Sequence, residues 1–131
     1  GEGAEAWLSW LMTNRMPPTG RVVLTPMLNE NGKLIGDFTI AKAAENRFMI
    51  WGSSGAQIYH MRWFEQHLPK DGSVAVHRFG QTMVGLSIAG PKSRALMEKL
   101  VDGDVSNEAF RFMDYREMDV PLPGQSDQLY W

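Results

Sequence analysis

The stretch Val22–Ile40, VVLTPMLNENGKLIGDFTI, decides the fold that we predict for this chain. It contains two runs of strand-forming residues joined by Asn31-Gly32. Asn-Gly favours a type I′ turn, because both central residues of that turn need a positive φ. The stretch is therefore predicted to form a β-hairpin with a two-residue loop.

A two-residue loop sets the register of the hairpin. It pairs Leu28 with Ile35 and Pro26 with Asp37. Alternation along the second strand then gives two faces, a core face with Leu34, Gly36, Phe38 and Ile40 and an opposite face with Ile35, Asp37 and Thr39.

Asp37 is the unusual residue of the hairpin, since aspartate is disfavoured in the middle of a strand. Its carboxylate is either solvated at an edge or held there for a purpose. Alternatively, backbone N–H groups satisfy it beside Pro26, because a proline leaves the ladder incomplete. The residues alone leave these alternatives open.

The rest of the chain predicts helices at 4–12, 55–68 and 91–101, and further strands at 47–51, 73–77, 82–89 and 112–120. We expect a serine to cap the second helix. The apolar positions expected to face inward are Ile58, Met61, Phe64 and Leu68 in the second helix and Leu96, Met97, Leu100 and Val101 in the third. Trp10 is either an interface residue or part of a second core face. This order predicts an α+β fold, an antiparallel meander sheet with two or three packing helices.

Length and composition limit the class of protein. The chain has 131 residues, so we expect one domain, 1–131. A net charge of −2 without a basic cluster argues against nucleic-acid binding. The absence of cysteine excludes disulfides and thiolate chemistry. No apolar run has the length of a membrane span and no signal peptide is visible, so we expect a cytoplasmic protein, or a mitochondrial matrix protein if the source is eukaryotic.

Catalytic and metal motifs are missing from the sequence. His60, His67 and His77 lack the H-E-x-x-H spacing, and we expect solvated or half-buried histidines and no metal site. There is no Gly-rich phosphate loop and no G-x-S-x-G.

Three segments carry a family resemblance: LTPMLNENGKLIGDFTI, RFMIWGSS and LSIAGPKSRALMEKL. Together they resemble the folate-binding domain of the glycine cleavage T-protein family, and most of all the C-terminal portion of dimethylglycine and sarcosine dehydrogenases. The matching positions are Thr25, Met27 to Glu30, Gly32, Ile35 and Asp37 in the hairpin, and Gly90, Pro91, Ser93 and Leu96 at a helix start.

The resemblance implies a tetrahydrofolate-dependent aminomethyl or one-carbon transfer, with the chain forming the first part of the folate-binding fold. It implies Asp37 as the catalytic residue and Thr25, Met27, Asp37, Gly52 and Ser53 as cofactor-binding residues. A methylated amine would be the source of the substrate, and FAD, if present, would belong to a separate domain. The alternative function is a non-catalytic folate-binding or assembly module that another chain completes.

Three departures from the family pattern stand out. Gly36 replaces the first of two successive aspartates that T-proteins often carry, and Ser53 replaces their asparagine. The Y-T-G-E-x-G-Y-E segment is absent, and 119–131 does not resemble it. We therefore expect a fragment, a truncated paralogue, or a domain completed by a second subunit or a further copy of the chain.

Overall fold

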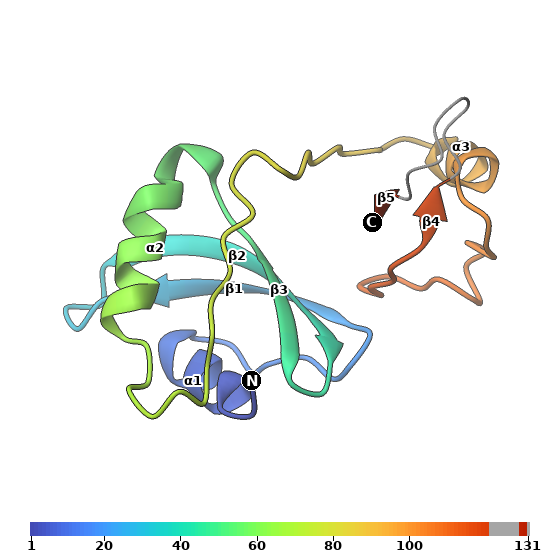
Figure 1. Cartoon of the computed structure of the whole chain (residues 1–131). Coiled ribbons are helices and arrows are strands. Elements are labelled where there is room, and N and C mark those ends of the chain that lie inside the picture. The colour runs from blue at the N-terminus through green and yellow to red at the C-terminus, as the bar shows by residue number, and fades with distance from the viewer. Residues whose placement is uncertain (121–128, 131) are drawn as a thin grey trace. The chain divides into compact units, whose positions relative to one another are not determined.

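The computed structural model describes residues 1–120 and the backbone of residues 129 and 130 (Figure 1). It divides into two compact units, Gly1–Arg78 and Phe79–Trp131. The loop expected at 121–128 lies outside the described residues. That 1–131 forms a single domain stays a prediction.

The first unit is a three-stranded antiparallel sheet with helices. Its elements are α1 (Ala4–Leu11), β1 (Val22–Leu28), β2 (Leu34–Ala44), β3 (Arg47–Trp51), the 3-10 helix η1 (Ser54–Ala56) and α2 (Gln57–Gln66). The strand order is β1-β2-β3, so β2 is central. This meander confirms the predicted α+β fold. No helix among the described residues is long and apolar enough to cross a membrane.

One core covers one face of this sheet. Residues from both helices, from β1 and β2, and from the segments at Met12 and Val74 form it: Trp7, Leu8, Leu11, Met12, Met27, Ile35, Phe38, Ile40, Phe64 and Val74. Lys42 also points to this side, and its Nζ lies 2.6 Å from a carboxylate oxygen of Glu5 in α1. The helices and the segment around Val74 therefore pack on the same face, where burial of apolar surface holds them.

The hairpin forms as predicted, but its turn is of another type. Asn31 does not have a positive φ, whereas Gly32 has a φ of 70°. The Asn29 side chain explains the difference, because its Oδ1 accepts hydrogen bonds from the backbone N of Asn31 (3.0 Å) and of Lys33 (2.9 Å). The backbone N of Gly32 also donates to the Asn29 carbonyl at 2.9 Å. The predicted type I′ turn is therefore wrong, and the observed turn is a longer one with glycine at its single left-handed position.

This longer turn changes the register next to it. Pro26 pairs with Asp37 as predicted, but Leu28 pairs with Leu34 instead of Ile35. Ile35 is the extra residue of a β-bulge, which lets two consecutive residues, Ile35 and Gly36, both face the core. Leu34 is consequently 63% exposed, so its predicted place in the core is wrong.

The first two helices also differ from the prediction in detail. Ile58 is 68% exposed, so its expected inward position is wrong. Ser53 precedes η1 without a capping hydrogen bond from its side chain. Trp10 is 69% exposed, which excludes a second core face there. The prediction that Trp10 contacts a partner is not tested.

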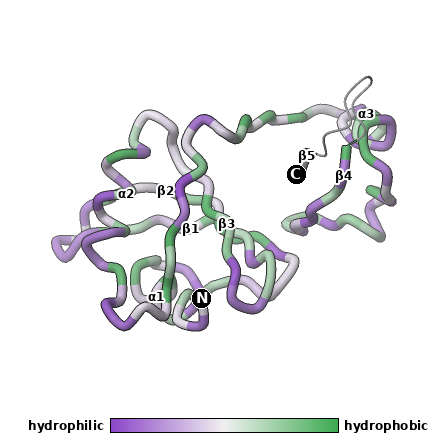
Figure 2. Tube along the Cα trace, viewed as in Figure 1, coloured by the Kyte–Doolittle hydropathy of each residue, from purple (hydrophilic) through white to green (hydrophobic). Residues whose placement is uncertain are grey.

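The second unit contains α3 (Ser93–Leu100), β4 (Asp119–Val120) and β5 (Leu129–Tyr130). The strand expected at 82–89 does not form, and only the end of 112–120 is a strand; in the first unit, the strand expected at 73–77 does not form either. Leu96 and Leu100 are exposed and Val101 is buried, so the expected apolar stripe of this helix is largely uncovered. Figure 2 shows hydrophobic positions along the extended stretch before α3, where Val84 and Leu86 are exposed.

The hairpin turn yields a test that separates the two turn types. Asn29→Ala removes the acceptor of two backbone N–H groups, so it should lower the free energy of unfolding by about 1–2 kcal/mol. Asn31→Ala should change it by less than about 0.5 kcal/mol, because Asn31 does not need a positive φ. Urea denaturation of both variants measures this. A type I′ turn would give the reverse order.

Candidate functional site

The face of the sheet away from the core carries a shallow hollow around Asp37. Its volume is about 270 Å³, and its lining comes from all three strands and the residue after β3: Leu24, Asp37, Phe38, Thr39, Trp51 and Gly52. Leu24 and Trp51 both pair with Thr39, so these three residues form one row across the sheet. Asp37 lies two residues before Thr39 on the central strand and therefore shares its face.

The Asp37 carboxylate is exposed and lies in the middle of the central strand. Among the described residues, no hydrogen bond or ion pair holds it. The alternative in which backbone N–H groups beside Pro26 satisfy this carboxylate is therefore wrong. The solvated alternative agrees with the structure, because Asp37 is exposed and the pairing of β2 with β3 ends at Thr39, so that β1 is the strand paired with β2 at Asp37 among the described residues. Asp37 is free to accept hydrogen bonds from a ligand in the hollow.

Phe38 fixes the direction of Asp37 by filling the opposite face. A Cβ at Gly36 would lie 2.8 Å from the Phe38 ring, and a Cβ at Gly52 would lie 2.7 Å from it. Both glycines therefore leave the room that the ring occupies. Because side chains alternate along a strand, a buried Phe38 places Asp37 on the open face.

His60 packs against the same ring from α2. The two ring centroids are 4.8 Å apart in an edge-to-face arrangement, and His60 is only 6% exposed. Its Nε2 lies 3.1 Å from the carbonyl oxygen of Ile35, the bulge residue. The expectation of solvated or half-buried histidines is thus wrong for His60, whereas His67 is half-buried and His77 is exposed.

The residues that the family resemblance suggested as cofactor-binding lie in different places. Asp37 and Gly52 line the hollow, and exposed Ser53 follows directly. Thr25 and Met27 are fully buried on the core side of β1. The Thr25 hydroxyl accepts a hydrogen bond from the backbone N of Asn14 at 3.1 Å, which anchors the segment after α1. In this structure Asp37, Gly52 and Ser53 come together, and Thr25 and Met27 serve the core.

Leu24 and Trp51 line the hollow, and sequence reasoning did not single them out. Trp51 is 42% exposed and Leu24 is 61% exposed, so both offer apolar surface next to the carboxylate. The signal was available in the register, because Pro26 opposite Asp37 puts Leu24 on the same face as Asp37. The place of Trp51 in the hollow could be found only from the pairing of β3 with β2, and the turn at 45–46 does not define that pairing by itself.

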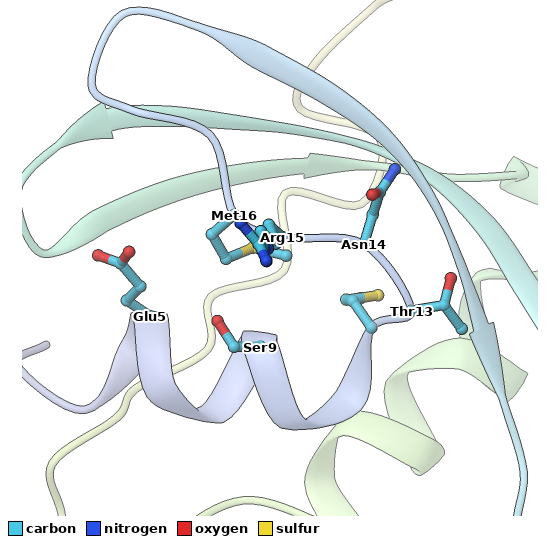
Figure 3. Close-up of a pocket in the computed structure, with 7 residues that line it drawn as sticks. Glu5, Ser9, Thr13, Asn14, Arg15 and Met16 are labelled. Atoms are coloured by element: carbon cyan, nitrogen blue, oxygen red, sulfur yellow. The ribbon is translucent and has the colours of Figure 1, made fainter.

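Figure 3 shows a second hollow, of about 420 Å³, between α1 and the segment that follows it. Most of its polar side chains already serve the fold. Glu5 binds Lys42, the Thr13 hydroxyl donates to the Pro26 carbonyl at 3.1 Å, and the Asn14 amide donates to the Leu24 carbonyl at 3.0 Å. We therefore place the candidate site at Asp37. No group of three His, Asp or Glu residues in the described part of the chain could hold a metal ion.

Comparison with known proteins agrees with the family that the sequence resembles. The model of the GCVT N-terminal domain matches residues 1–122. The chain belongs to this family. It is 26% identical to human mitochondrial dimethylglycine dehydrogenase over 92% of the chain. It is 29% identical to the sarcosine oxidase subunit alpha of Rhizobium meliloti over 79% of the chain, and 28% identical to the aminomethyltransferase of Bacillus subtilis over 87%.

The chain spans 14%, 11% and 32% of the lengths of these three relatives, respectively. The comparison therefore identifies a domain of the kind found in aminomethyltransferases and in enzymes that act on dimethylglycine or sarcosine. Its resemblance to the T-protein family is confirmed.

The geometry of the site predicts that Asp37 matters little for stability. Asp37→Asn should change the free energy of unfolding by less than about 0.5 kcal/mol, because the carboxylate is exposed and holds no partner among the described residues. Thr25→Val is the contrasting variant from the opposite face. It should cost about 1–3 kcal/mol, since the backbone N–H of Asn14 loses its acceptor. Equal loss of stability in both variants, measured by urea denaturation, would contradict this assignment of faces.

Proposed function

We propose that this chain is the tetrahydrofolate-binding part of an aminomethyl or one-carbon transferase and that the ligand binds at the Asp37 hollow. One observation supports this most directly. Asp37 presents a carboxylate without a partner, among the described residues, on the open face of the sheet and next to exposed Trp51. Membership of the GCVT N-terminal domain family supports the chemical class.

The size of the hollow limits what it holds. Its volume of about 270 Å³ lies just below the range of roughly 300–1,000 Å³ that is common for small-molecule pockets. We infer that it takes one ring system of the ligand, with the remainder extending beyond the hollow. The flat apolar face of Trp51 suits a heteroaromatic ring, and the carboxylate suits ring N–H donors.

The residues of this chain would act by orientation and electrostatics. When bound, a reduced folate supplies the nitrogen that accepts the one-carbon unit. Asp37 can accept a proton from that region or stabilise positive charge that develops there. Leu24 and Trp51 put apolar surface beside the carboxylate, and a ligand that covered the hollow would exclude water there and strengthen such an interaction.

The activity of the longer protein is part of the same proposal. By analogy with the relatives, the one-carbon unit would come from a methylated amine such as dimethylglycine or sarcosine, and any flavin would lie in a separate domain. A mitochondrial location would follow if the protein is a eukaryotic counterpart of the dimethylglycine dehydrogenases.

A non-catalytic folate-binding or assembly module is the second candidate function. The shallowness of the hollow favours it. A one-carbon transfer assay on the protein that contains this domain separates the two functions, because only the transferase turns over.

Binding of a reduced folate tests the site directly. Calorimetric titration of the chain with 5-formyltetrahydrofolate should show saturable binding. Asp37→Asn should weaken it about tenfold or more, because a hydrogen bond to a charged group contributes about 1.5–3 kcal/mol. Glu30→Gln is the matched control, since it removes the same charge at the exposed hairpin turn. Absence of binding, or equal binding by both variants, would contradict the proposal.

The aromatic wall of the hollow gives an independent test. Trp51→Leu should weaken the same binding about fivefold to a hundredfold, because stacking on an aromatic side chain contributes about 1–3 kcal/mol. Trp10→Leu removes an equally large exposed indole, but from α1, and should leave the affinity unchanged. If both variants lose the same affinity, Trp51 is not part of the binding site.

A further inference from the structure

His60 is one of two buried polar side chains among the described residues, the other being Thr25. Burial of an imidazole is costly unless its polar atoms are hydrogen-bonded. The Nε2 of His60 lies 3.1 Å from the carbonyl oxygen of Ile35, within hydrogen-bond distance. Because a carbonyl can only accept, Nε2 must carry the hydrogen of this bond.

The acceptor lies at a particular place in the sheet. Ile35 is the extra residue of the bulge between the turn and Asp37, and the extra residue of a bulge is left unpaired in the ladder. His60 therefore supplies from α2 a donor that β1 does not provide. This bond fixes the backbone two residues before Asp37.

The His60 ring also lies near the glycines of both backbone segments beside the hollow. A Cβ at Gly36, the residue before Asp37, would lie 2.6 Å from Nε2. A Cβ at Gly52, which lines the hollow, would lie 3.5 Å from Nδ1. The ring thus occupies the space that a side chain at Gly36 would need, and it lies beside Gly52 on the core side.

A residue whose role was only to fill the core would not need this hydrogen bond. An apolar side chain of similar size would fill the same volume without the cost of burying a polar ring, but it would leave the Ile35 carbonyl without its donor. Phe38 and Phe64 already supply apolar contact here, with ring centroids 5.6 Å apart.

We infer that His60 is a positioning residue for Asp37: its Nε2–H holds the bulge carbonyl of Ile35 and so fixes the backbone from which Asp37 extends to the open hollow. This inference rests on the proposed function of Asp37. His60 does not reach the open face, so it acts only through the backbone of β2.

Two substitutions in the 131-residue chain test the inference. His60→Gln keeps an N–H donor, and His60→Leu removes it. With 5-formyltetrahydrofolate as the probe, His60→Leu should lose affinity at least about fivefold, whereas His60→Gln should stay within about twofold of the wild type. His67→Leu is the control at the residue that follows α2, because the Nδ1 of His67 lies 2.8 Å from the Trp63 carbonyl of that helix and not near β2. It should leave the affinity unchanged.

Nuclear magnetic resonance decides the question without the probe. Nitrogen shifts of the wild-type imidazole should show the hydrogen on Nε2, and a ring with hydrogen on Nδ1 alone would overturn the inference. His60→Leu should speed hydrogen exchange of the Gly36 and Asp37 amides, while His60→Gln and His67→Leu should leave their exchange rates near the wild-type values. Equal exchange rates in His60→Gln and His60→Leu would also overturn it.

These readouts separate the two proposals. If the wild-type chain does not bind the probe but the His60 variants show the expected amide exchange, the folate proposal fails and the role of His60 in placing Asp37 stands. If the wild type binds and His60→Leu binds equally well, only the positioning role fails. Should His60→Leu not fold, the wild-type tautomer and the His60→Gln variant still decide.

Discussion

The packing of the Phe38 ring between two glycines is the constraint on which the rest of the first unit depends. Gly36 and Gly52 have no side chain, so the ring lies against the sheet where any Cβ would collide with it. His60 and Phe64 from α2 then close over the ring. Trp7 reaches Phe64 from α1, with ring centroids 5.8 Å apart, so one aromatic cluster ties both helices to the central strand.

This one-sided packing explains why the candidate site is open. Both helices and the segment around Val74 contribute to a single core on one face. The other face receives no helix within the first unit, and Leu24, Asp37 and Trp51 remain exposed there. Asp37 lies on this face beside β1 and just past the end of β3, with no helix of the first unit over it, which is an arrangement suited to a ligand.

The second unit shows that an apolar pattern alone produces neither a paired strand nor a buried helix face. The segment 82–89 alternates like a strand, yet strands need a neighbour for their backbone hydrogen bonds, and none pairs with it among the described residues. Leu96 and Leu100 have the spacing of a buried helical stripe, and both are exposed. Among the described residues of this unit, the buried hydrophobic side chains are those of Val101 and Val105. The Arg94 guanidinium donates hydrogen bonds to the carbonyls of Val105 and Phe110.

The sequence by itself determined the hairpin, the pairing of Pro26 with Asp37, the third strand, both helices of the first unit and the family. These features follow from local signals: strand-forming runs, an Asn-Gly turn, helical spacing and a specific motif around Asp37. Local signals are read from neighbouring residues, so no tertiary contact was needed to find them.

Only the tertiary structure decided the features that depend on contacts between distant residues. The Asn29 side chain selected the turn, and the resulting bulge moved Ile35 into the core. His60 became a buried partner of that bulge because α2 packs against β2, 25 residues away in sequence. Trp51 joined Asp37 because β3 pairs with β2. The chemistry of Asp37 could be suspected from the sequence, but its open face, its missing partner among the described residues and its neighbours came from packing.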